Sequence, residues 1–295
     1  DKNLNADPER ADELEAIFKE GSFEGIAGRI WPKLERIIAA GTGAFSIYTD
    51  QMRHYTGDIP HINALYASSE ALIGTETDTE GQYQLSTRNA FVEFVPLGAS
   101  FDTALPAGET EEGREYSLLV TSYAGLYRYK LDDVVKIRGF KDDLPVFTFE
   151  GRLSDRINTG YGDVTDGEIY RALCGLSEKT GKRPADYAYL LNEDENSLTV
   201  YAETSGESED NYPATPEESG LLDEILSDIS EAYAKAREKG TLKELTLSYV
   251  EPESQLLYRD MRRLRKHCSP DQIKPVRNIA NPAASGYMKL KSIRG

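Results

Sequence analysis

The chain has 295 residues, of which 39% are hydrophobic and 29% are charged, which is typical of a globular protein large enough for two domains. Its formal net charge of −17 argues against binding to nucleic acid or to an anionic membrane, because both need a cationic surface. Two cysteines and three scattered histidines argue against a disulfide framework and a zinc site. The sequence has no signal-peptide pattern and no apolar run near roughly 18 residues, so we expect a cytoplasmic protein.

The N-terminal region opens with a helix signal. Asp7 suits an N-cap, Pro8 suits the first turn, and Glu9 suits the positive end of the helix dipole. The pattern then predicts a helix over residues 23–30, a strand over 34–40 and a helix over 44–55. Gly41-Thr42-Gly43 lies between the last two elements, where many folds hold a nucleotide or an anion, although a plain turn has the same composition.

A strand predicted over residues 61–67 runs into Ser68-Ser69-Glu70. One interpretation is a helix cap made by a serine and completed by Glu70. The other is a set of oxygen ligands for a phosphate and its Mg²⁺. Residues 75–87 are polar and predict an exposed hairpin or loop, and residues 91–95 predict another strand.

The most informative stretch covers residues 117–140 and predicts two or three successive strands. Gly125 interrupts it, and Asp132-Asp133 is expected at a turn between strands. Carboxylates at such a turn could accept hydrogen bonds from a sugar diol in a cleft, although an ordinary solvated hairpin turn looks the same.

Beyond a strand over residues 146–150 the pattern changes to a separate α/β unit, and we place a domain boundary near Glu150. The predicted elements are helices over 166–179, 221–239 and 254–266, and strands over 187–191, 197–201 and 245–250. An acidic loop covers 203–220. The last helix carries a basic patch, interpreted as a solvated face or a partner for the acidic loop: Arg259, Arg262, Arg263, Arg265 and Lys266.

Three strings in a fixed order connect these elements to a known family. They are Tyr66-Ala67-Ser68-Ser69-Glu70, then Tyr127-Arg128-Tyr129-Lys130-Leu131-Asp132-Asp133, then Phe149-Glu150-Gly151-Arg152. With Gly41-Thr42-Gly43 before them and Gln272-Ile273-Lys274-Pro275-Val276-Arg277 after them, the series resembles the acyl-acid amido synthetases of the Gretchen Hagen auxin-responsive family. That family belongs to the adenylate-forming superfamily, and the resemblance runs over nearly the whole chain.

The resemblance implies an α/β fold. Residues 1–150 would form part of a large adenylating domain of mixed β-sheets and helices, and residues 151–295 a smaller, mobile α+β C-terminal domain. The implied activity is an ATP-dependent ligase that adenylates a carboxylic acid and transfers the acyl group to an amine, with ATP and Mg²⁺ as cofactors. Small acyl acids and amines would be its partners, with no nucleic acid and no membrane.

The resemblance also implies roles for single residues. Tyr66, Ser68, Ser69 and Glu70 would contact the adenylate, with Ser69 near the α-phosphate and Glu70 towards Mg²⁺. Asp133 would accept both ribose hydroxyls and Arg152 would lie at the hinge near the ribose. Gly41, Thr42 and Gly43 would line the adenine or acyl pocket. Lys274 would neutralise phosphate charge in the transition state, a role for which Lys289 and Lys291 compete.

The chain departs from the family pattern in three places. Asp132 replaces a glycine, which leaves open which aspartate binds ribose, and Tyr161-Gly162-Asp163-Val164 replaces a stretch with a Glu-Lys pair. Residues 1–66 contain no Ser/Thr/Gly-rich loop of the kind that holds the β- and γ-phosphates. We therefore expect the chain to be the C-terminal portion of a longer protein, missing the N-terminal half and inactive alone, rather than a truncated relative.

Two other functions stay open at this point. One is a ligase that hands the acyl group to a thiol instead of an amine. The other is a non-catalytic nucleotide- or acyl-binding module that keeps the fold without the chemistry, which the departures favour.

Overall fold

The computed structural model describes residues 5–205, 213–267, 269 and 274–293. Part of the acidic loop (206–212), Cys268, and Gln272 and Ile273 of the last family string lie outside the described residues. Within those ranges no helix is both long and apolar enough to cross a bilayer.

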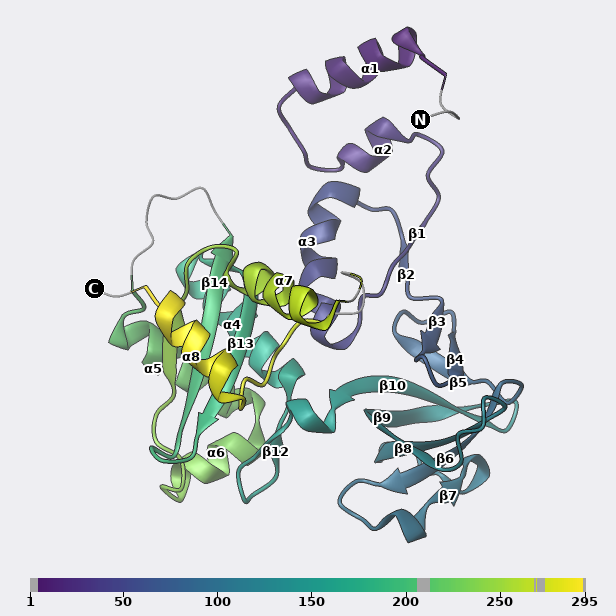
Figure 1. Cartoon of the computed structure of the whole chain (residues 1–295), viewed down its shortest axis with the longest axis vertical. Helices are drawn as coiled ribbons and strands as arrows, with labels where there is room; N and C mark the ends of the chain where they lie inside the picture. Colours follow the sequence, from purple (N-terminus) through teal and green to yellow (C-terminus); the bar gives the residue numbers. More distant parts are fainter. Residues whose placement is uncertain (1–4, 206–212, 268, 270–273, 294–295) are drawn as a thin grey trace.

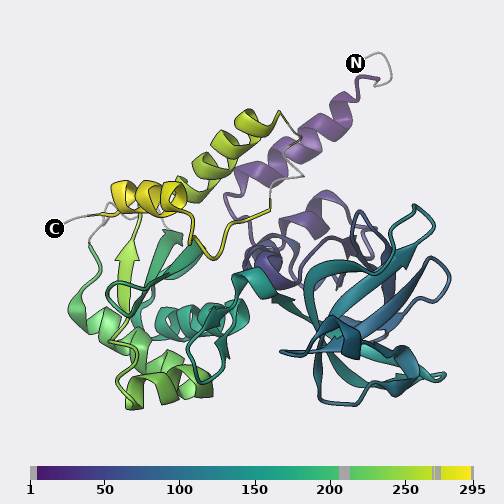
Figure 2. The ribbon, with the colours of Figure 1, turned by 60° about the horizontal axis from the view of Figure 1, so that its bottom comes forward.

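Two sheets lie side by side in the structure (Figures 1 and 2). One has eight strands and the other has three strands with helices on both faces. The predicted α/β class is therefore confirmed.

The N-terminal helices form an arm at the top of Figure 1. The first, α1 (Pro8–Lys19), begins as predicted, because the Asp7 carboxylate accepts a hydrogen bond from the N–H of Arg10 at 3.0 Å. The guanidinium of Arg10 in turn donates to the carbonyl of Ile30, at the end of α2 (Ile26–Ile30). The side chains of α1 include none that is fully buried, so the arm is held by few contacts.

The predicted strand over residues 34–40 is reduced to β1 (Ile37–Ile38), which pairs in parallel with β2 (His61–Ile62). Between them lie the 3₁₀ turn η1 (Gly43–Phe45) and helix α3 (Ser46–Thr56). The strand predicted over 61–67 is broken at Ala64, whose φ of 50° is left-handed. The carboxylate of Glu76 accepts the N–H groups of Asn63 and Ala64, which stabilises this corner and sends the chain into a different sheet.

The eight-stranded sheet is antiparallel throughout, in the order β3-β4-β5-β10-β9-β8-β6-β7. Its apolar residues alternate with polar ones and fill one buried core, which includes Phe94, Tyr116 and Phe147, all fully buried. Its strands are β3 (Leu65–Ala67), β4 (Leu72–Glu76), β5 (Gln82–Leu85), β6 (Ala90–Pro96), β7 (Leu105–Pro106), β8 (Glu115–Ser122), β9 (Tyr129–Lys141) and β10 (Leu144–Arg152).

Two predictions for this sheet were wrong in part. Asp132 and Asp133 lie inside β9 and not at a turn, because the reversal is made earlier, by Gly125 and by Arg128, whose φ of 45° is left-handed. Residues 75–87 do form a hairpin, of β4 and β5, and its tip at residues 78–80 is exposed as predicted, but Tyr83 in β5 alternates with polar neighbours and is fully buried.

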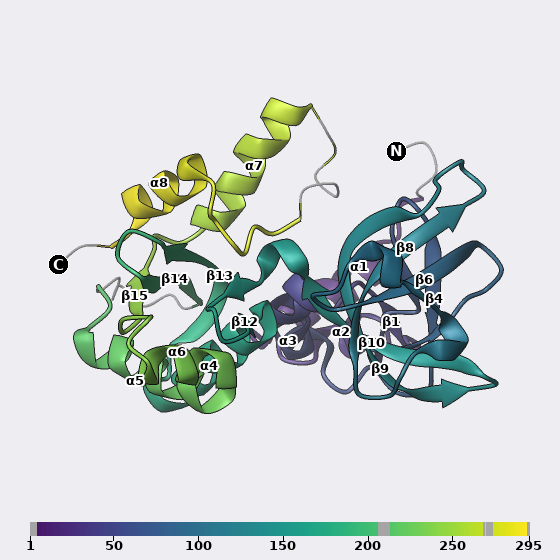
Figure 3. The same ribbon diagram turned by 90° about the horizontal axis from the view of Figure 1, so that it is seen from below.

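The second unit follows the short connection η4 (Leu153–Asp155) and the hairpin of β11 (Ile157–Asn158) and β12 (Asp163–Val164). Its sheet has the order β13-β14-β15, with the first pair antiparallel and the second parallel. Helices α4, α5 and α6 cover one face and α7 and α8 the other (Figure 3). The elements are α4 (Asp166–Thr180), β13 (Arg183–Asn192), β14 (Ser197–Ser205), α5 (Pro216–Ile229), α6 (Glu231–Glu238), β15 (Thr246–Tyr249), α7 (Ser254–Lys266) and α8 (Pro282–Lys291).

The helix predicted over residues 221–239 is two helices. Ser230 lies between them with extended backbone, and its hydroxyl accepts a hydrogen bond from the N–H of Tyr233 as the N-cap of α6. Ser230 is fully buried, so the break turns α6 back against the sheet.

Helix α3 joins the two units. Ile47 is 1% exposed and packs into the core beneath α4 and α5, although it belongs to the N-terminal half of the chain. The Tyr48 hydroxyl donates to Asp186 at 2.6 Å, and the Gln51 amide donates to the carbonyl of Ala185 at 2.7 Å. These contacts fix the cleft between the sheets.

Helix α4 begins with a capping box. The Thr165 hydroxyl accepts the N–H of Glu168, and the Glu168 carboxylate accepts the N–H of Thr165. Thr165→Ala removes the cap, so we expect the free energy of unfolding to fall by about 1 kcal/mol. Urea unfolding measures this, with Thr87→Ala, in an exposed loop, as a control expected to change little. A stability loss equal to that of the control would contradict the role of the cap.

Candidate functional site

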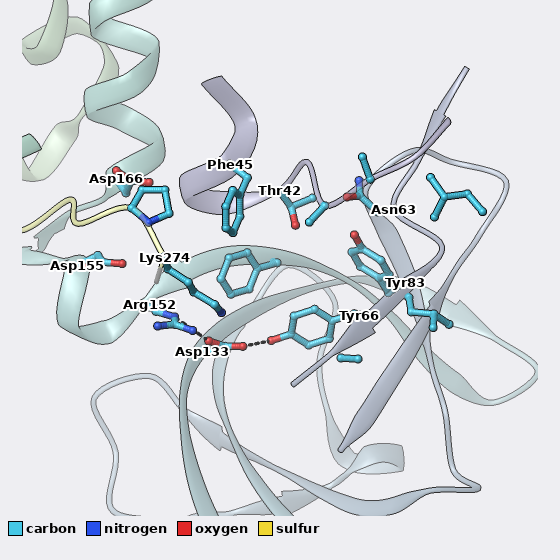
Figure 4. A pocket seen from close by; sticks show the side chains of 18 residues that line it. Thr42, Phe45, Asn63, Tyr66, Tyr83, Asp133, Arg152, Asp155, Asp166 and Lys274 are labelled. Carbon is cyan, nitrogen blue, oxygen red and sulfur yellow. Dashed lines mark hydrogen bonds and ion pairs between the residues drawn. The ribbon is translucent and has the colours of Figure 1, made fainter. Parts of the chain in front are cut away.

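A cavity of about 310 Å³ opens between the two sheets. Its lining comes from the η1 turn, β3, β5, the ends of β9 and β10, and the segment before residue 277 (Figure 4). We call it the central pocket. It brings together five of the predicted site residues: Thr42, Tyr66, Asp133, Arg152 and Lys274.

A triad of Tyr66, Asp133 and Arg152, joined by one hydrogen bond and one ion pair, lies at the floor of the central pocket. The Tyr66 hydroxyl donates to Oδ2 of Asp133 at 2.6 Å, and Nε of Arg152 lies 3.4 Å from Oδ1. Burial, followed by the charge of Asp133, raises the pKa of Tyr66 well above its ordinary value, so this tyrosine stays protonated and acts as a donor.

The register of β9 and β10 creates the triad. Asp133 and Arg152 are cross-strand partners, just after an irregularity in the pairing. Gly151 lies in that irregularity with a φ of 97°, a conformation that favours glycine. The bulge directs Arg152 to the face that carries Asp133.

The two adjacent aspartates have different surroundings. Successive side chains of a strand point to opposite faces, so Asp132 leaves the pocket and accepts hydrogen bonds from the hydroxyl and N–H of Ser154. Asp132 therefore does not add a second carboxylate to the pocket. Of the pair, Asp133 is the one that lines the pocket.

Aromatic rings form one wall of the pocket. Tyr66 packs against Tyr83 and Phe149, with ring centroids 5.5 and 5.7 Å away, and the ring of Phe45 also lines the pocket. Flat apolar faces of this kind suit a heterocycle or an aromatic acid.

The Gly41-Thr42-Gly43 turn approaches this wall closely. Gly43 has a φ of 60°, and a Cβ there would lie 2.4 Å from the ring of Phe149. A Cβ on Gly41 would lie 2.5 Å from the Thr49 hydroxyl. The N–H of Gly41 donates to the Asn63 side chain at 2.6 Å, which holds the turn against β2.

The opposite wall is charged and contains Lys274, Asp155 and Asp166. Burial, followed by the positive charge of Arg152, lowers the pKa of Lys274, while Asp133 and Glu70 oppose this shift. Burial, followed by the charge of Asp166, raises the pKa of Asp155 to about 6. Asp166 accepts a hydrogen bond from the Tyr187 hydroxyl at 2.8 Å.

A buried arginine anchors the segment that carries Lys274. Arg277 is 1% exposed, donates to Asp186 at 2.6 Å, and stacks on the ring of Tyr187 at 3.9 Å. Its carbonyl accepts the N–H of Tyr189, so the segment runs along the edge of β13. Lys274 therefore lies three residues before Arg277, whose position is fixed by these contacts.

Other predicted site residues lie outside the pocket lining. Ser68, Ser69 and Glu70 form the turn between β3 and β4, where the Ser68 hydroxyl accepts the N–H groups of Glu70 and Ala71. The helix-cap interpretation was wrong, because a strand follows. Lys289 and Lys291 belong to α8, and Lys291 pairs with Glu251 at 2.6 Å.

Sequence reasoning missed several lining residues, among them the aromatic and polar ones Phe45, Asn63, Tyr83, Asp155 and Asp166. Asp155 follows Arg152 at the end of a strand, a position that could have marked it. The sequence around Asn63 indicates only a turn, and that around Asp166 only the start of a capped helix, so neither pattern marks a site residue.

Comparisons with known proteins identify the family of the chain. Residues 1–61 match the sequence model of the GH3 family N-terminal domain, and residues 83–152 match that of the GH3 family central domain. The chain belongs to the GH3 family. The indole-3-acetic acid-amido synthetase GH3.6 of Arabidopsis thaliana is 30% identical over 224 residues, which cover 68% of this chain and 35% of that protein. The jasmonoyl–L-amino acid synthetase JAR4 of Nicotiana attenuata is 37% identical over 182 residues, covering 58% and 32%.

The fold of this GH3 chain also matches a solved structure. The GH3.15 acyl acid amido synthetase superposes with a TM-score of 0.83 at 21% identity, covering 99% of this chain and 54% of that one. This chain thus spans about half the length of that structure, and less than half the length of the two relatives above.

The raised pKa of Asp155 makes a prediction about stability. Between its ordinary pKa of 3.8 and about 6, the folded state keeps a proton that the unfolded chain has released. The contribution of this group to stability therefore falls as the pH rises through that window. We expect Asp155→Asn to be more stable than the natural protein above pH 6, with the difference shrinking as the pH falls and disappearing below pH 4.

Thermal unfolding between pH 4 and pH 8 measures this difference, with Asp58→Asn, at an exposed position, as the control. An Asp155→Asn variant without a gain in stability at pH 7.5 would mean that Arg152 and Lys274 already compensate the buried charge.

Proposed function

We propose that this protein is an ATP-dependent acyl-acid amido synthetase that works through an acyl-adenylate. The observation that carries the proposal is the central pocket, where an anchored carboxylate, an aromatic wall and two cations meet in one cavity. Membership of the GH3 family supports it, as do relatives named as amido synthetases of indole-3-acetic acid and of jasmonate.

The nucleotide would bind with its sugar at Asp133. Tyr66 and Arg152 hold that carboxylate from two sides, so its orientation is fixed before a ligand arrives. A carboxylate has four lone-pair sites, which is enough to accept both ribose hydroxyls while keeping these partners. The adenine or the acyl group would then lie on the aromatic wall, beside Gly41, Thr42 and Gly43.

The first step would join the carboxylic acid to the nucleotide. An oxygen of the acid attacks the α-phosphorus of ATP, the bond from that phosphorus to the β-phosphate oxygen breaks, and pyrophosphate leaves. Lys274 and Arg152 lie on the charged side of the pocket and would offset the negative charge that develops. The lowered pKa of Lys274 is consistent with a desolvated cation without a bound anion.

The residues near the pocket mouth also suit Mg²⁺. In nucleotide sites this ion is held by one or two carboxylates together with phosphate oxygens. The described residues contain no group of three or more metal-binding side chains, so a protein cage is absent from that part of the chain. Glu70 is partly buried and near enough to Lys274 to raise its pKa, and it would supply the carboxylate. Bound Mg²⁺ would withdraw charge from the phosphate oxygens.

In the second step an amine would attack the activated carbonyl, form the amide and release AMP. The free amine is the nucleophile. As the bond from carbonyl carbon to phosphate oxygen breaks, AMP leaves with the electron pair and the amine nitrogen loses a proton to water. We propose that residues 151–295 rotate as a mobile domain between the steps, against part of the adenylating domain in residues 1–150. Such a rotation would have to break the Tyr48–Asp186 and Gln51–Ala185 hydrogen bonds. The reaction would take place in the cytoplasm, where ATP is available.

The paired aspartates provide the test. Asp133→Asn keeps an acceptor for Tyr66 but loses the charge and one acceptor oxygen, so AMP binding should weaken roughly 10- to 100-fold. Asp132→Asn, one residue away on the opposite face, should change it less than about threefold. Calorimetry with AMP and ATP–pyrophosphate exchange measure both, with unfolding curves to show that each variant folds.

The assay uses the protein as its gene encodes it, because residues 1–66 contain no Ser/Thr/Gly-rich phosphate loop. Equal losses in the two variants would refute the ribose assignment. Natural protein that binds no AMP would favour a module without the chemistry. Acyl transfer to a thiol but not to an amine would identify a thioester-forming ligase.

A further inference from the structure

A second cavity of about 360 Å³ adjoins the central pocket and is lined mainly by cations. It shares Arg152, Asp155 and Lys274 with the central pocket. Arg262 and Lys266, one turn apart on α7, complete its charged lining. We call it the cationic cavity. Figure 3 shows α7 on the face of the second sheet opposite α4, α5 and α6.

The charges in this cavity are unbalanced. Among the described residues, four cations and one carboxylate, Asp155, line it, in a chain whose net charge is −17. Arg152 is engaged with Asp133 at 3.4 Å. The other three, Arg262, Lys266 and Lys274, form no ion pair with any residue in the described ranges. Their neighbour Arg263, by contrast, pairs with Asp260 at 3.2 Å.

This arrangement differs from an ordinary basic helix face. Cations on a solvated face diverge and are screened by water and salt, whereas these converge on one cavity from α7, from the end of β10 and from the segment before Arg277. Lys274 is also affected by the neighbouring positive charge, since burial and then the charge of Arg152 lower its pKa. A multivalent anion would relieve that crowding.

We propose that the cationic cavity binds the pyrophosphate group of ATP and holds it as the leaving group, a role that rests on the proposed function. When the acid bonds to the α-phosphorus, the electron pair of the breaking bond stays on the bridging oxygen. Negative charge then develops on the β-phosphate side. Arg152 and Lys274 border both cavities, so this oxygen would lie between them, with Arg262 and Lys266 facing the distal phosphate.

The amount of charge favours pyrophosphate over the carboxylate of an amino-acid acceptor. A carboxylate carries one negative charge, which Arg152 or Lys274 alone would match. Pyrophosphate carries about three negative charges near neutral pH, with several acceptor oxygens for the donors that Arg262 and Lys266 add. The acceptor carboxylate is therefore an alternative that the experiment has to separate.

The experiment measures the binding of inorganic pyrophosphate by calorimetry at physiological ionic strength, using the protein as its gene encodes it. The test variant is Arg262→Gln/Lys266→Gln. The matched control is Arg265→Gln/Lys179→Gln, which removes the same charge from two exposed residues outside the cavity lining. We expect the Kd for pyrophosphate to rise about tenfold in the test variant and less than about twofold in the control. AMP binding should be unchanged in both.

Equal effects in the two variants would overturn the proposal, because they would show general charge attraction. An unchanged Kd in the test variant would overturn it as well. Loss of affinity for glutamate or glycine, with pyrophosphate binding intact, would assign the cavity to the amine acceptor instead. If Arg262→Gln/Lys266→Gln folds poorly, Lys266→Gln alone, at an exposed position, gives the same comparison with Lys179→Gln.

The two proposals fail in different ways. The natural protein could bind pyrophosphate through Arg262 and Lys266 and still form no acyl-adenylate. That result would refute the proposed function, and the leaving-group role with it. Normal adenylate formation, with pyrophosphate binding indifferent to Arg262 and Lys266, would refute only the assignment of the cationic cavity.

Discussion

The arrangement of the site depends on one buried charge, the guanidinium of Arg277. Burying a charge costs several kcal/mol unless it is paired and hydrogen-bonded, and this one has Asp186 at 2.6 Å and the ring of Tyr187 at 3.9 Å. Asp186 also accepts the hydroxyl of Tyr48, which comes from the first half of the chain. One carboxylate therefore connects α3, β13 and the segment that carries Lys274. The cleft has its shape because these three elements must meet to neutralise Arg277.

The chemistry of the pocket depends on a second constraint, the pairing of β9 with β10. A strand separates adjacent side chains onto opposite faces, and that alternation gives Asp132 and Asp133 different partners. The bulge at Gly151 then directs Arg152 towards the same face as Asp133. The triad of Tyr66, Asp133 and Arg152 is thus a product of backbone geometry, and it exists before any ligand binds.

The elements with strong local signals could be predicted from the sequence. The cap and Pro8 gave the start of α1, and apolar periodicity gave β6, α4 and α7. The errors have physical causes that lie far away in the chain. The corner at Ala64 depends on Glu76, which accepts its N–H from another strand. The exposure predicted for residues 75–87 fails in β5, where Tyr83 is buried by rings of β3 and β10.

Only the site residues that belong to a family motif could be predicted from the sequence. The family resemblance drew attention to Tyr66, Asp133, Arg152 and Lys274, and the fold brings them into one cavity. No local pattern distinguishes Asp132 from Asp133, since that difference depends on which face of a strand is covered. Asp155 and Asp166 owe their place in the pocket to the packing of the two sheets, which composition and periodicity do not encode.

Ile47 has a thermodynamic consequence for the molecule as a whole. Its side chain completes a core formed otherwise by residues after 150, and it sits on a helix that begins beside the Gly41-Thr42-Gly43 turn. If either half of the chain unfolds, the other half loses the apolar contacts that Ile47 makes between them. The two sheets are therefore energetically coupled, and heat should disrupt them in one cooperative transition despite their separate topologies. The domain rotation proposed above would have to expose Ile47 to water if it separated the two sheets, and this exposure would add a hydrophobic cost to the motion.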